Sequence, residues 1–214
     1  MFKKKILNHL NLQKSFGIEY SEPISFDKNF ISSENLPSKI EDLNEYIEHC
    51  NLCELSKQTK NKILGYGNKN SELYIVGLSC DFQNNEIINI ISIVLEKVLE
   101  LNIRDIYLTN LIKCPVLLKN NINKENINLC KEYFIKQIDI MRPRYIIALG
   151  DVSNYLLENK NKISYKNGNC YDYNNINLIP MLDLEFVYKN PSYYEELYKN
   201  FEKLKILMGQ KWNI

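Results

Sequence analysis

The sequence predicts an α/β protein of three layers, with a central parallel four-stranded sheet between two layers of helices. Short apolar runs rich in β-branched and aromatic residues, which are typical of buried strands, alternate with longer segments of helical period. The clearest run, residues 145–150, is apolar throughout, as in a parallel strand covered on both faces. Strands and helices alternating in this way form a doubly wound parallel sheet.

Each expected element has its own signal. The expected strands are apolar runs, and they comprise residues 73–77, 106–108, 145–150 and 176–181. The expected helices comprise about residues 38–48, 87–101, 125–140 and 191–208, with a short helix after Asp151. Ser38 and Glu41 have the spacing of a capping box, and Pro191 suits the first turn of the last helix.

Residues 1–36 are expected to form a separate N-terminal helix and arm, followed by one α/β domain over residues 37–214. Residues 2–16 have a helical period, whereas residues 18–36 have none. Such an arm either packs against the domain or docks a protein partner. The chain has no apolar run long enough for a secretory signal or a membrane span, which predicts a cytoplasmic protein without membrane contact.

Composition narrows the choice of function. The 214 residues are 45% hydrophobic and 25% charged, which is ordinary for a soluble globular protein. The net charge is +1, so the overall charge gives no electrostatic reason to expect nucleic-acid binding. Six cysteines in a chain expected in the cytoplasm indicate metal binding or packing rather than disulfides.

Four of these cysteines suit one site: Cys50, Cys53, Cys114 and Cys130. The first two form a C-x2-C pair, which can present two thiolates to one metal centre. The other two are far apart in sequence, whereas a zinc ribbon needs two close pairs. The spacing leaves three alternatives open: a four-iron cluster held by four thiolates, a zinc site, or buried packing cysteines at the last two positions.

Asn110 is a candidate ligand-binding residue. Thr109 and Asn110 follow the strand expected at 106–108, and ligands of open α/β sheets bind beyond the carboxyl ends of the strands. A side-chain amide offers one acceptor and two donors, so it can recognise a polar ring edge. The alternative is an asparagine that only stabilises the turn after the strand.

Over about residues 36–207, the motifs resemble those of the iron–sulfur uracil-DNA glycosylases, families four and five, and their phage-polymerase-associated relatives. The most specific match is YLTNLIKC at 107–114, which is similar to the family motif Y-[IV]-T-N-x-x-K-C. Further matches are C-x2-C at 50–53, G-x-G-N at 65–68, P-x-x-I-x-x-L-G at 143–150, and K-N-P at 189–191, where the family has R-N-P.

The resemblance implies a cofactor and a base-reading residue. Cys130 stands where the family has its fourth cluster ligand, so the four cysteines would hold a 4Fe-4S cluster. Asn110 would read a flipped uracil, accepting a hydrogen bond from N3–H and donating one to O4, a pairing that cytosine reverses.

Two other active-site motifs of the family are not preserved. After the first strand the family has G-E-x-P-G, whereas this chain has GLSCD at 77–81. Asp81 is then the candidate for positioning a water, and Phe82 is the candidate for the ring that stacks on the base. The family's H-P-x-x-L motif would place its histidine at Asp183, where a carboxylate would repel the uracil anion formed on cleavage.

These matches and departures predict a uracil-DNA glycosylase-like 4Fe-4S protein of DNA metabolism whose uracil excision is weak or lost. The alternative is a non-catalytic iron–sulfur module that binds nucleic acid or a protein partner. A small-molecule α/β enzyme is disfavoured, because Gly65 and Gly67 precede the first strand, whereas a phosphate-binding glycine loop follows it. The expected partner is single-stranded or uracil-containing DNA, whose phosphates would contact the lysines near residue 110: Lys113, Lys119, Lys124 and Lys131.

Overall fold

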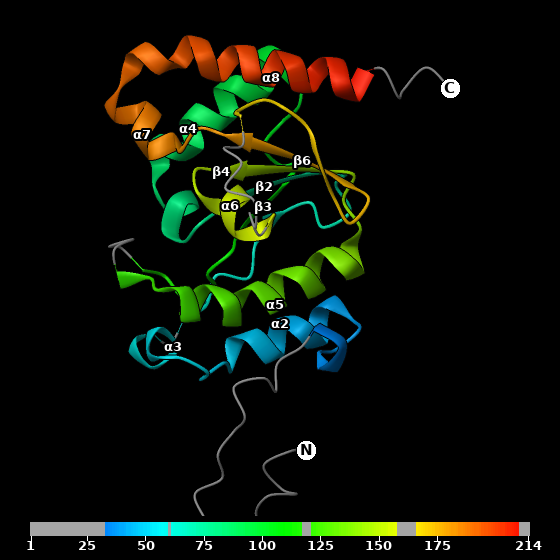
Figure 1. The fold of residues 1–214 in the computed structure, drawn as a ribbon, viewed down its shortest axis with the longest axis vertical. Helices are drawn as coiled ribbons and strands as arrows, with labels where there is room; N and C mark the ends of the chain where they lie inside the picture. The colour runs from blue at the N-terminus through cyan, green and yellow to red at the C-terminus, as the bar shows by residue number, and fades with distance from the viewer. Residues whose placement is uncertain (1–32, 60, 117–120, 158–165, 210–214) are drawn as a thin grey trace, which may run out of the picture. The chain divides into compact units, whose positions relative to one another are not determined.

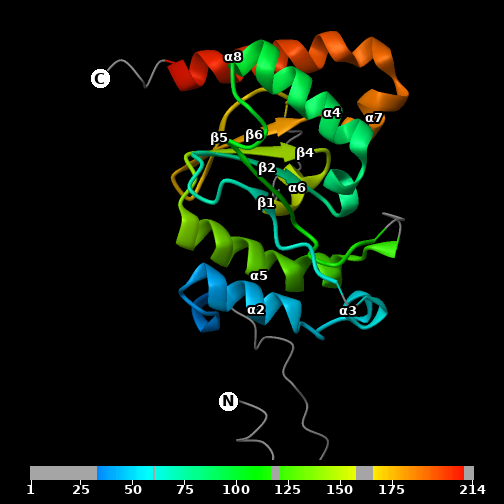
Figure 2. The same cartoon turned by 180° about the vertical axis from the view of Figure 1, so that it is seen from behind.

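The computed structural model describes residues 33–59, 61–116, 121–157 and 166–209, and its centre is a six-stranded sheet in the order β1-β3-β2-β4-β6-β5 (Figures 1 and 2). The strands are β1 (Tyr66–Gly67), β2 (Leu73–Gly77), β3 (Tyr107–Asn110), β4 (Tyr145–Leu149), β5 (Tyr171–Tyr173) and β6 (Ile176–Met181). The four inner strands pair in parallel. The predicted central parallel four-stranded sheet is therefore confirmed.

The sequence did not indicate the two short antiparallel strands at the sheet edges. β1 pairs with β3 where only a turn was expected, and β5 forms a tight hairpin with β6. Asn174 and Asn175, which join β5 to β6, have φ angles of 52° and 65°. Two successive positive φ angles are what a type I′ hairpin turn requires, and asparagine tolerates them. β1, of only two residues, is too short to show an alternating pattern.

Helices cover both faces of the sheet (Figures 1 and 2). In chain order they are η2 (Ser33–Asn35), α2 (Ile40–Glu48), α3 (Glu54–Gln58), η3 (Cys80–Gln83), α4 (Asn85–Val94), the π-helical turn η4 (Leu95–Leu99), α5 (Lys124–Met141), α6 (Val152–Leu156), α7 (Leu184–Lys189), η6 (Pro191–Tyr193) and α8 (Tyr194–Gly209). One face lies under α4, α7 and α8, and the other lies under α5 and α6, with α2 packed outside α5. The predicted three-layer α/β/α fold is thus confirmed.

Side-chain alternation along the strands builds a separate apolar core on each face. In β4, Ile147 and Leu149 join the core beneath α4, α7 and α8, whereas Ile146 and Ala148 join the core beneath α5 and α6. All four side chains are buried. A strand covered on both faces must be apolar at every position, and for this reason the run at 145–150 was the clearest strand signal.

Two helix boundaries differ from the sequence signals. The predicted capping box of Ser38 and Glu41 is wrong, because Lys39 is the N-cap of α2 and no side chain caps that helix. A capping box lies instead at α5, where the side chains of Asn123 and Asn126 accept from each other's backbone N–H groups. The helix α7, just before the last helix, had no sequence signal of its own and is only six residues long.

Nearly all of the predicted N-terminal helix and arm, residues 1–32, lies outside the described residues. All described residues belong to one of the two units into which contacts divide the chain, Ser32–Ile214. Within the described ranges, no helix is both long enough and apolar enough to cross a bilayer.

Candidate active site at the carboxyl edge of the sheet

Asn110 ends β3 with its side chain buried at the carboxyl edge of the parallel strands. The residue has 0% relative exposure, and neither Oδ1 nor Nδ2 has a hydrogen-bond partner within the described part of the chain. Its backbone is fixed by register, because Asn110 pairs with Gly77 of β2. A buried amide without partners costs about 1–3 kcal/mol, so its retention indicates a use for its donors and acceptor.

Gly77 provides the space into which two predicted site residues converge. A Cβ added at Gly77 would lie 2.8 Å from Asn110 Oδ1 and 2.7 Å from Asp81 Oδ2. The Asp81 carboxylate accepts a hydrogen bond from the Ser79 backbone N–H at 3.0 Å, which turns it back toward β2. The structure thus brings Asp81 and Asn110 together over one glycine, and a larger residue at 77 would displace them.

Asp183 lies further along the same edge. It follows β6 and packs against Gly150, where an added Cβ would lie 3.1 Å from Asp183 Cβ. Its Oδ1 accepts a hydrogen bond from the Phe186 backbone N–H at 2.9 Å, so Asp183 is the N-cap of α7. Three strand intervals separate β6 from β3, about 14 Å at the usual strand spacing. Asp183 and Asn110 therefore mark opposite ends of the candidate site.

Phe82 is half-buried in η3, the short helix that also carries Asp81. Its ring packs against the apolar core beneath α4, α7 and α8. Phe82 directly follows Asp81 in the chain, and stacking of its ring on a base stays a prediction.

The structure gathers the four predicted cysteines from separate elements. Cys50 follows α2, Cys53 is the N-cap of α3, Cys114 follows β3, and Cys130 lies in α5. The interaction between the Cys53 and Cys114 thiols lowers the pKa of Cys53 to about 5 and raises the pKa of Cys114. Burial raises the pKa of Cys130 to about 11, and the charges of Cys50 and Cys53 add to the rise. All four sulfurs therefore interact electrostatically.

The four thiols match the ligand set of a four-iron cluster in number and kind. In the described ranges, no three His, Cys, Asp or Glu side chains are grouped closely enough to hold one metal ion. A tetrahedral zinc site, with bonds of about 2.3 Å, brings its sulfurs to about 3.8 Å from one another. In a four-iron cluster each thiolate binds a different iron, so the sulfurs stand further apart. The donor set of two half-buried and two buried thiols fits such a cluster.

Tyr133 adds a polar group to the cysteine region. Its side chain is 1% exposed, and its hydroxyl lies near Cys50, so that burial and the charge of this sulfur raise the pKa of Tyr133 above its usual range. The geometry nevertheless falls short of a hydrogen bond, and the hydroxyl has no partner among the described residues. A buried hydroxyl left without a partner beside the thiols is consistent with a sulfur-rich group filling the space between them.

The prediction that Lys113 contacts DNA phosphates is wrong, because the residue is only 1% exposed to solvent. Its ammonium donates to Thr109 Oγ1 at 2.9 Å, to the Asn110 backbone oxygen at 2.7 Å and to Gln137 Oε1 at 2.6 Å. Burial lowers the pKa of Lys113 to about 7. Lys131 is also buried, at 8% exposure. Of the four predicted DNA-binding lysines, Lys124 is at the surface and the remaining one, at position 119, lies outside the described residues.

Gln137 is a residue that the sequence analysis missed. It is 0% exposed on the inner face of α5, and its Nε2 donates to the Leu64 backbone oxygen at 2.9 Å. The available signal was its position seven residues after Cys130, on a helix face that is otherwise apolar. A polar residue on such a face indicates a buried partner, here Lys113.

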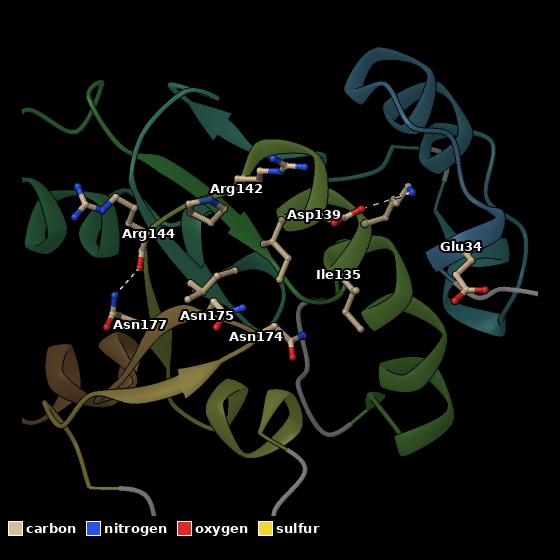
Figure 3. A pocket seen from close by; sticks show the side chains of 12 residues that line it. Glu34, Ile135, Asp139, Arg142, Arg144, Asn174, Asn175 and Asn177 are labelled. Atoms are coloured by element: carbon tan, nitrogen blue, oxygen red, sulfur yellow. Dashed lines mark hydrogen bonds and ion pairs between the residues drawn. The ribbon is translucent and has the colours of Figure 1, made fainter.

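A cavity of about 650 Å³ lies at the opposite edge of the sheet, at the amino ends of β4 and β6 (Figure 3). Residues 142–144, residues 174–177 and the last turns of α5 line it. Lys136, one of its cations, pairs with Asp139 at 3.8 Å. The cavity therefore contains none of the predicted site residues, which lie at the carboxyl ends of the strands.

Comparison with known proteins tests the family resemblance. The family model described as the uracil DNA glycosylase superfamily matches residues 64–207, about two thirds of the chain. The chain belongs to this superfamily. It is 32% identical over 144 residues to the Type-4 uracil-DNA glycosylase of Pyrobaculum aerophilum, which covers 62% of this chain and 74% of that protein. It is 25% identical over 188 residues to the Type-4 uracil-DNA glycosylase of Archaeoglobus fulgidus, which covers 80% of this chain and 94% of that protein.

The superfamily match includes the whole carboxyl edge described above. Residues 64–207 contain Asn110, Asp81 and Asp183, and also the later cysteines of the predicted cluster, whereas the C-x2-C pair at 50–53 precedes them. Membership in the uracil DNA glycosylase superfamily confirms the predicted resemblance. The role of each residue and the cofactor stay predictions.

Replacing Asn110 with alanine should leave the free energy of unfolding unchanged or raise it by up to about 1 kcal/mol, because an unpartnered buried amide is removed. Asn126→Ala is the matched control: it also removes a buried amide, but one that completes the capping box of α5, so it should lower stability by about 1 kcal/mol. Urea unfolding of the two variants measures both effects. A loss of 1 kcal/mol or more in Asn110→Ala would mean that this amide has a structural partner.

Proposed function

We propose that this chain is a uracil-DNA glycosylase-like protein of DNA repair that carries a 4Fe-4S cluster and excises uracil weakly or not at all. The observation that carries the proposal is the buried, unpartnered amide of Asn110 at the carboxyl edge of the sheet. The names of the relatives support uracil in DNA as the substrate class.

Asn110 is suited to reading a base that has left the DNA stack. Its Oδ1 would accept from uracil N3–H and its Nδ2 would donate to O4, whereas cytosine presents the opposite pattern. Pairing of β3 with β2 fixes the backbone position from which this amide projects. The Asp81 carboxylate approaches the same glycine, and it would orient a water near the sugar.

The other end of the carboxyl edge, at Asp183, supports the proposal that uracil excision is weak. Cleavage of the glycosidic bond leaves negative charge on the uracil, and loss of one preorganised donor for such a charge costs roughly 10²–10³ in rate. Asp183 offers a carboxylate instead of a donor, and it is already occupied in capping α7. Leu78 stands where the family has an acidic residue, and its side chain packs against the core on the α5 side of the sheet.

The four cysteines would supply all the cluster ligands. When bound, the cluster supplies a set of iron–thiolate bonds that joins four chain segments. Those segments are the end of α2, the start of α3, the loop after β3 and the middle of α5. Ser79 strengthens this connection, because its hydroxyl donates to the Cys114 backbone oxygen at 3.1 Å and accepts from Val116 N–H at 3.1 Å. The loop after β2 and the loop that carries Cys114 are thus held together.

A non-catalytic iron–sulfur module that binds nucleic acid or a protein partner is the second candidate. The N-cap formed by Asp183 favours it, since this side chain has a structural task that needs no substrate. Such a module would keep the base-reading amide and the cluster but would release no uracil.

The experiment that tests the proposal measures DNA binding and uracil release by the unmodified protein. Fluorescence anisotropy with single-stranded DNA should show weak binding, with log K falling against log salt at a slope between about −0.7 and −2, which corresponds to one to three phosphate contacts. Lys124→Gln should reduce the slope by about 0.7. Lys131→Gln, at a buried position, should not change it.

Uracil release is measured on the same samples, with uracil-containing and matched thymine-containing strands. Slow or undetectable release together with binding would support the proposal. Release at the rate of an efficient repair glycosylase would contradict the weak-activity part of it. Absence of binding at low salt would contradict DNA as the partner.

A further inference from the structure

Lys113 is a buried cation whose three ammonium protons all go to neutral oxygens. The acceptors are Thr109 Oγ1, the Asn110 backbone oxygen and Gln137 Oε1, at 2.9, 2.7 and 2.6 Å. Within the described residues, no carboxylate oxygen is among its partners. Burying an ammonium without an anion is strongly unfavourable, because the charge loses its hydration and gains only dipoles in return. A nearby negative charge would therefore stabilise the protonated form of this side chain.

The groups beside Lys113 that can carry this charge are cysteines. Lys113 directly precedes Cys114, and its ammonium contacts Gln137 and the ring of Phe134, two residues that follow Cys130 on the same helix, α5. Both cysteines are buried, at 2% and 4% exposure. The ring of Phe134, with its centroid 5.8 Å from Nζ, closes the site on a further side. In such an apolar enclosure, charges interact far more strongly than they do in water.

We infer that Lys113 is the counter-cation of the 4Fe-4S cluster and that its hydrogen bonds couple the cluster to the end of β3, which carries Asn110. The inference rests on the proposed cluster. Four thiolates around a four-iron core leave the cluster with net negative charge, and a fixed cation offsets it. Through its side chain Lys113 holds Thr109 and Asn110, and it is the residue directly before Cys114, so one residue connects both sites.

The inference has a consequence that a merely structural lysine would not have. Reduction adds an electron to a cluster that is already negative, and a nearby cation favours the reduced form. Loss of the lysine charge should therefore shift the midpoint potential to more negative values. We expect at least a tenfold change in the equilibrium constant of reduction, which is 59 mV for a one-electron couple.

The test uses the full chain, purified anaerobically with its cluster, and an electrode or dye-mediated redox titration. Lys113→Met and Lys113→Gln both remove the charge, and the glutamine keeps an N–H donor for the Asn110 backbone oxygen. Lys113→Arg keeps the charge and should keep the potential near that of the wild type. Lys136→Met is the matched control. Lys136, on α5, is also a buried lysine, at 9% exposure, but it pairs with the carboxylate of Asp139.

Each outcome decides the question. A negative shift in both neutral variants, absent from the Arg variant and from Lys136→Met, is the expected result. If both neutral variants lose their iron, the Arg variant decides. Retention of the cluster by Lys113→Arg supports the inference, whereas loss of iron from Lys113→Arg as well overturns it. Unchanged potentials, or equal shifts at Lys113 and Lys136, overturn the inference but leave the proposed cluster intact. Wild-type protein without iron and sulfide overturns the cluster itself, which is a separate failure.

Discussion

The variant that combines Leu78→Glu with Asp183→His should release uracil from DNA measurably, whereas the wild type and each single variant should not. Leu78→Glu restores the acidic side chain after β2, and Asp183→His replaces a repelling carboxylate with a hydrogen-bond donor. The two defects lie at different strands of one edge, beside β2 and β6. Residues of one active site act as a unit, so one repair should not raise the rate while the other defect remains.

The gain in the double variant should be on the order of 10²-fold or more, which is the usual contribution of one preorganised donor to a developing anion. Adding Asn110→Ala should abolish it, because the base is then no longer read. The measurement is single-turnover release of uracil from single- and double-stranded DNA.

Asp183→Asn is the control for charge and helix capping. Asparagine caps helices about as well as aspartate does, so this variant keeps the N-cap of α7 and removes only the negative charge. Asp183→His removes the cap as well and should cost about 1 kcal/mol in stability. Efficient uracil release by the unmodified protein would show that Asp183 and Leu78 are not defects at all.

Cys114→Ser and Cys130→Ser should each lose the cluster, and each should melt at a lower temperature than the wild type. The cluster would join α2 and α3 to the loop after β3 and to α5, so its loss releases segments that the apolar cores hold only in part. A loss of about 4 kcal/mol lowers the melting temperature of a chain of this size by roughly 8–16 °C. Differential scanning calorimetry of anaerobic samples, with iron and sulfide analysis, measures both quantities.

Cys170→Ser is the matched control for these serine variants. Cys170 is an exposed cysteine outside the predicted ligand set, so its replacement should change neither iron content nor melting temperature. Wild-type melting of Cys114→Ser or Cys130→Ser would mean that the cluster does not hold the fold together. Stoichiometric zinc without sulfide in the wild type would show that the four thiols bind a different metal.

The sequence by itself determined the parallel sheet and the principal helices. The runs that became β2, β4 and β6 are apolar at most positions because helices cover them on both faces, and this requirement is local enough to appear in the residue order. The helical period of α5 likewise indicated the helix that carries Cys130. The edge strands β1 and β5 were not predicted, because two or three residues are too few to show an alternating pattern.

For the candidate site, the sequence identified the residue types, and only the tertiary structure decided how they are used. Asn110 and the four cysteines could be named from motif and chemistry. That Asp81 turns back over Gly77 beside Asn110 depends on a loop conformation, and that Asp183 caps α7 depends on a short helix without a strong signal. Neither arrangement is encoded in spacing alone.

Lys113 shows the limit most clearly. In the sequence it is one of several lysines near Asn110, and a solvated lysine and a buried one look the same. Its burial depends on Gln137, 24 residues away on α5, and the neighbouring loop is tied by Ser79 to Cys114 across 35 residues. Local patterns report which face of an element is apolar, but the partner of a buried polar group is set by which elements pack together. The tertiary structure therefore decided that this lysine is buried against the end of β3 that carries Asn110.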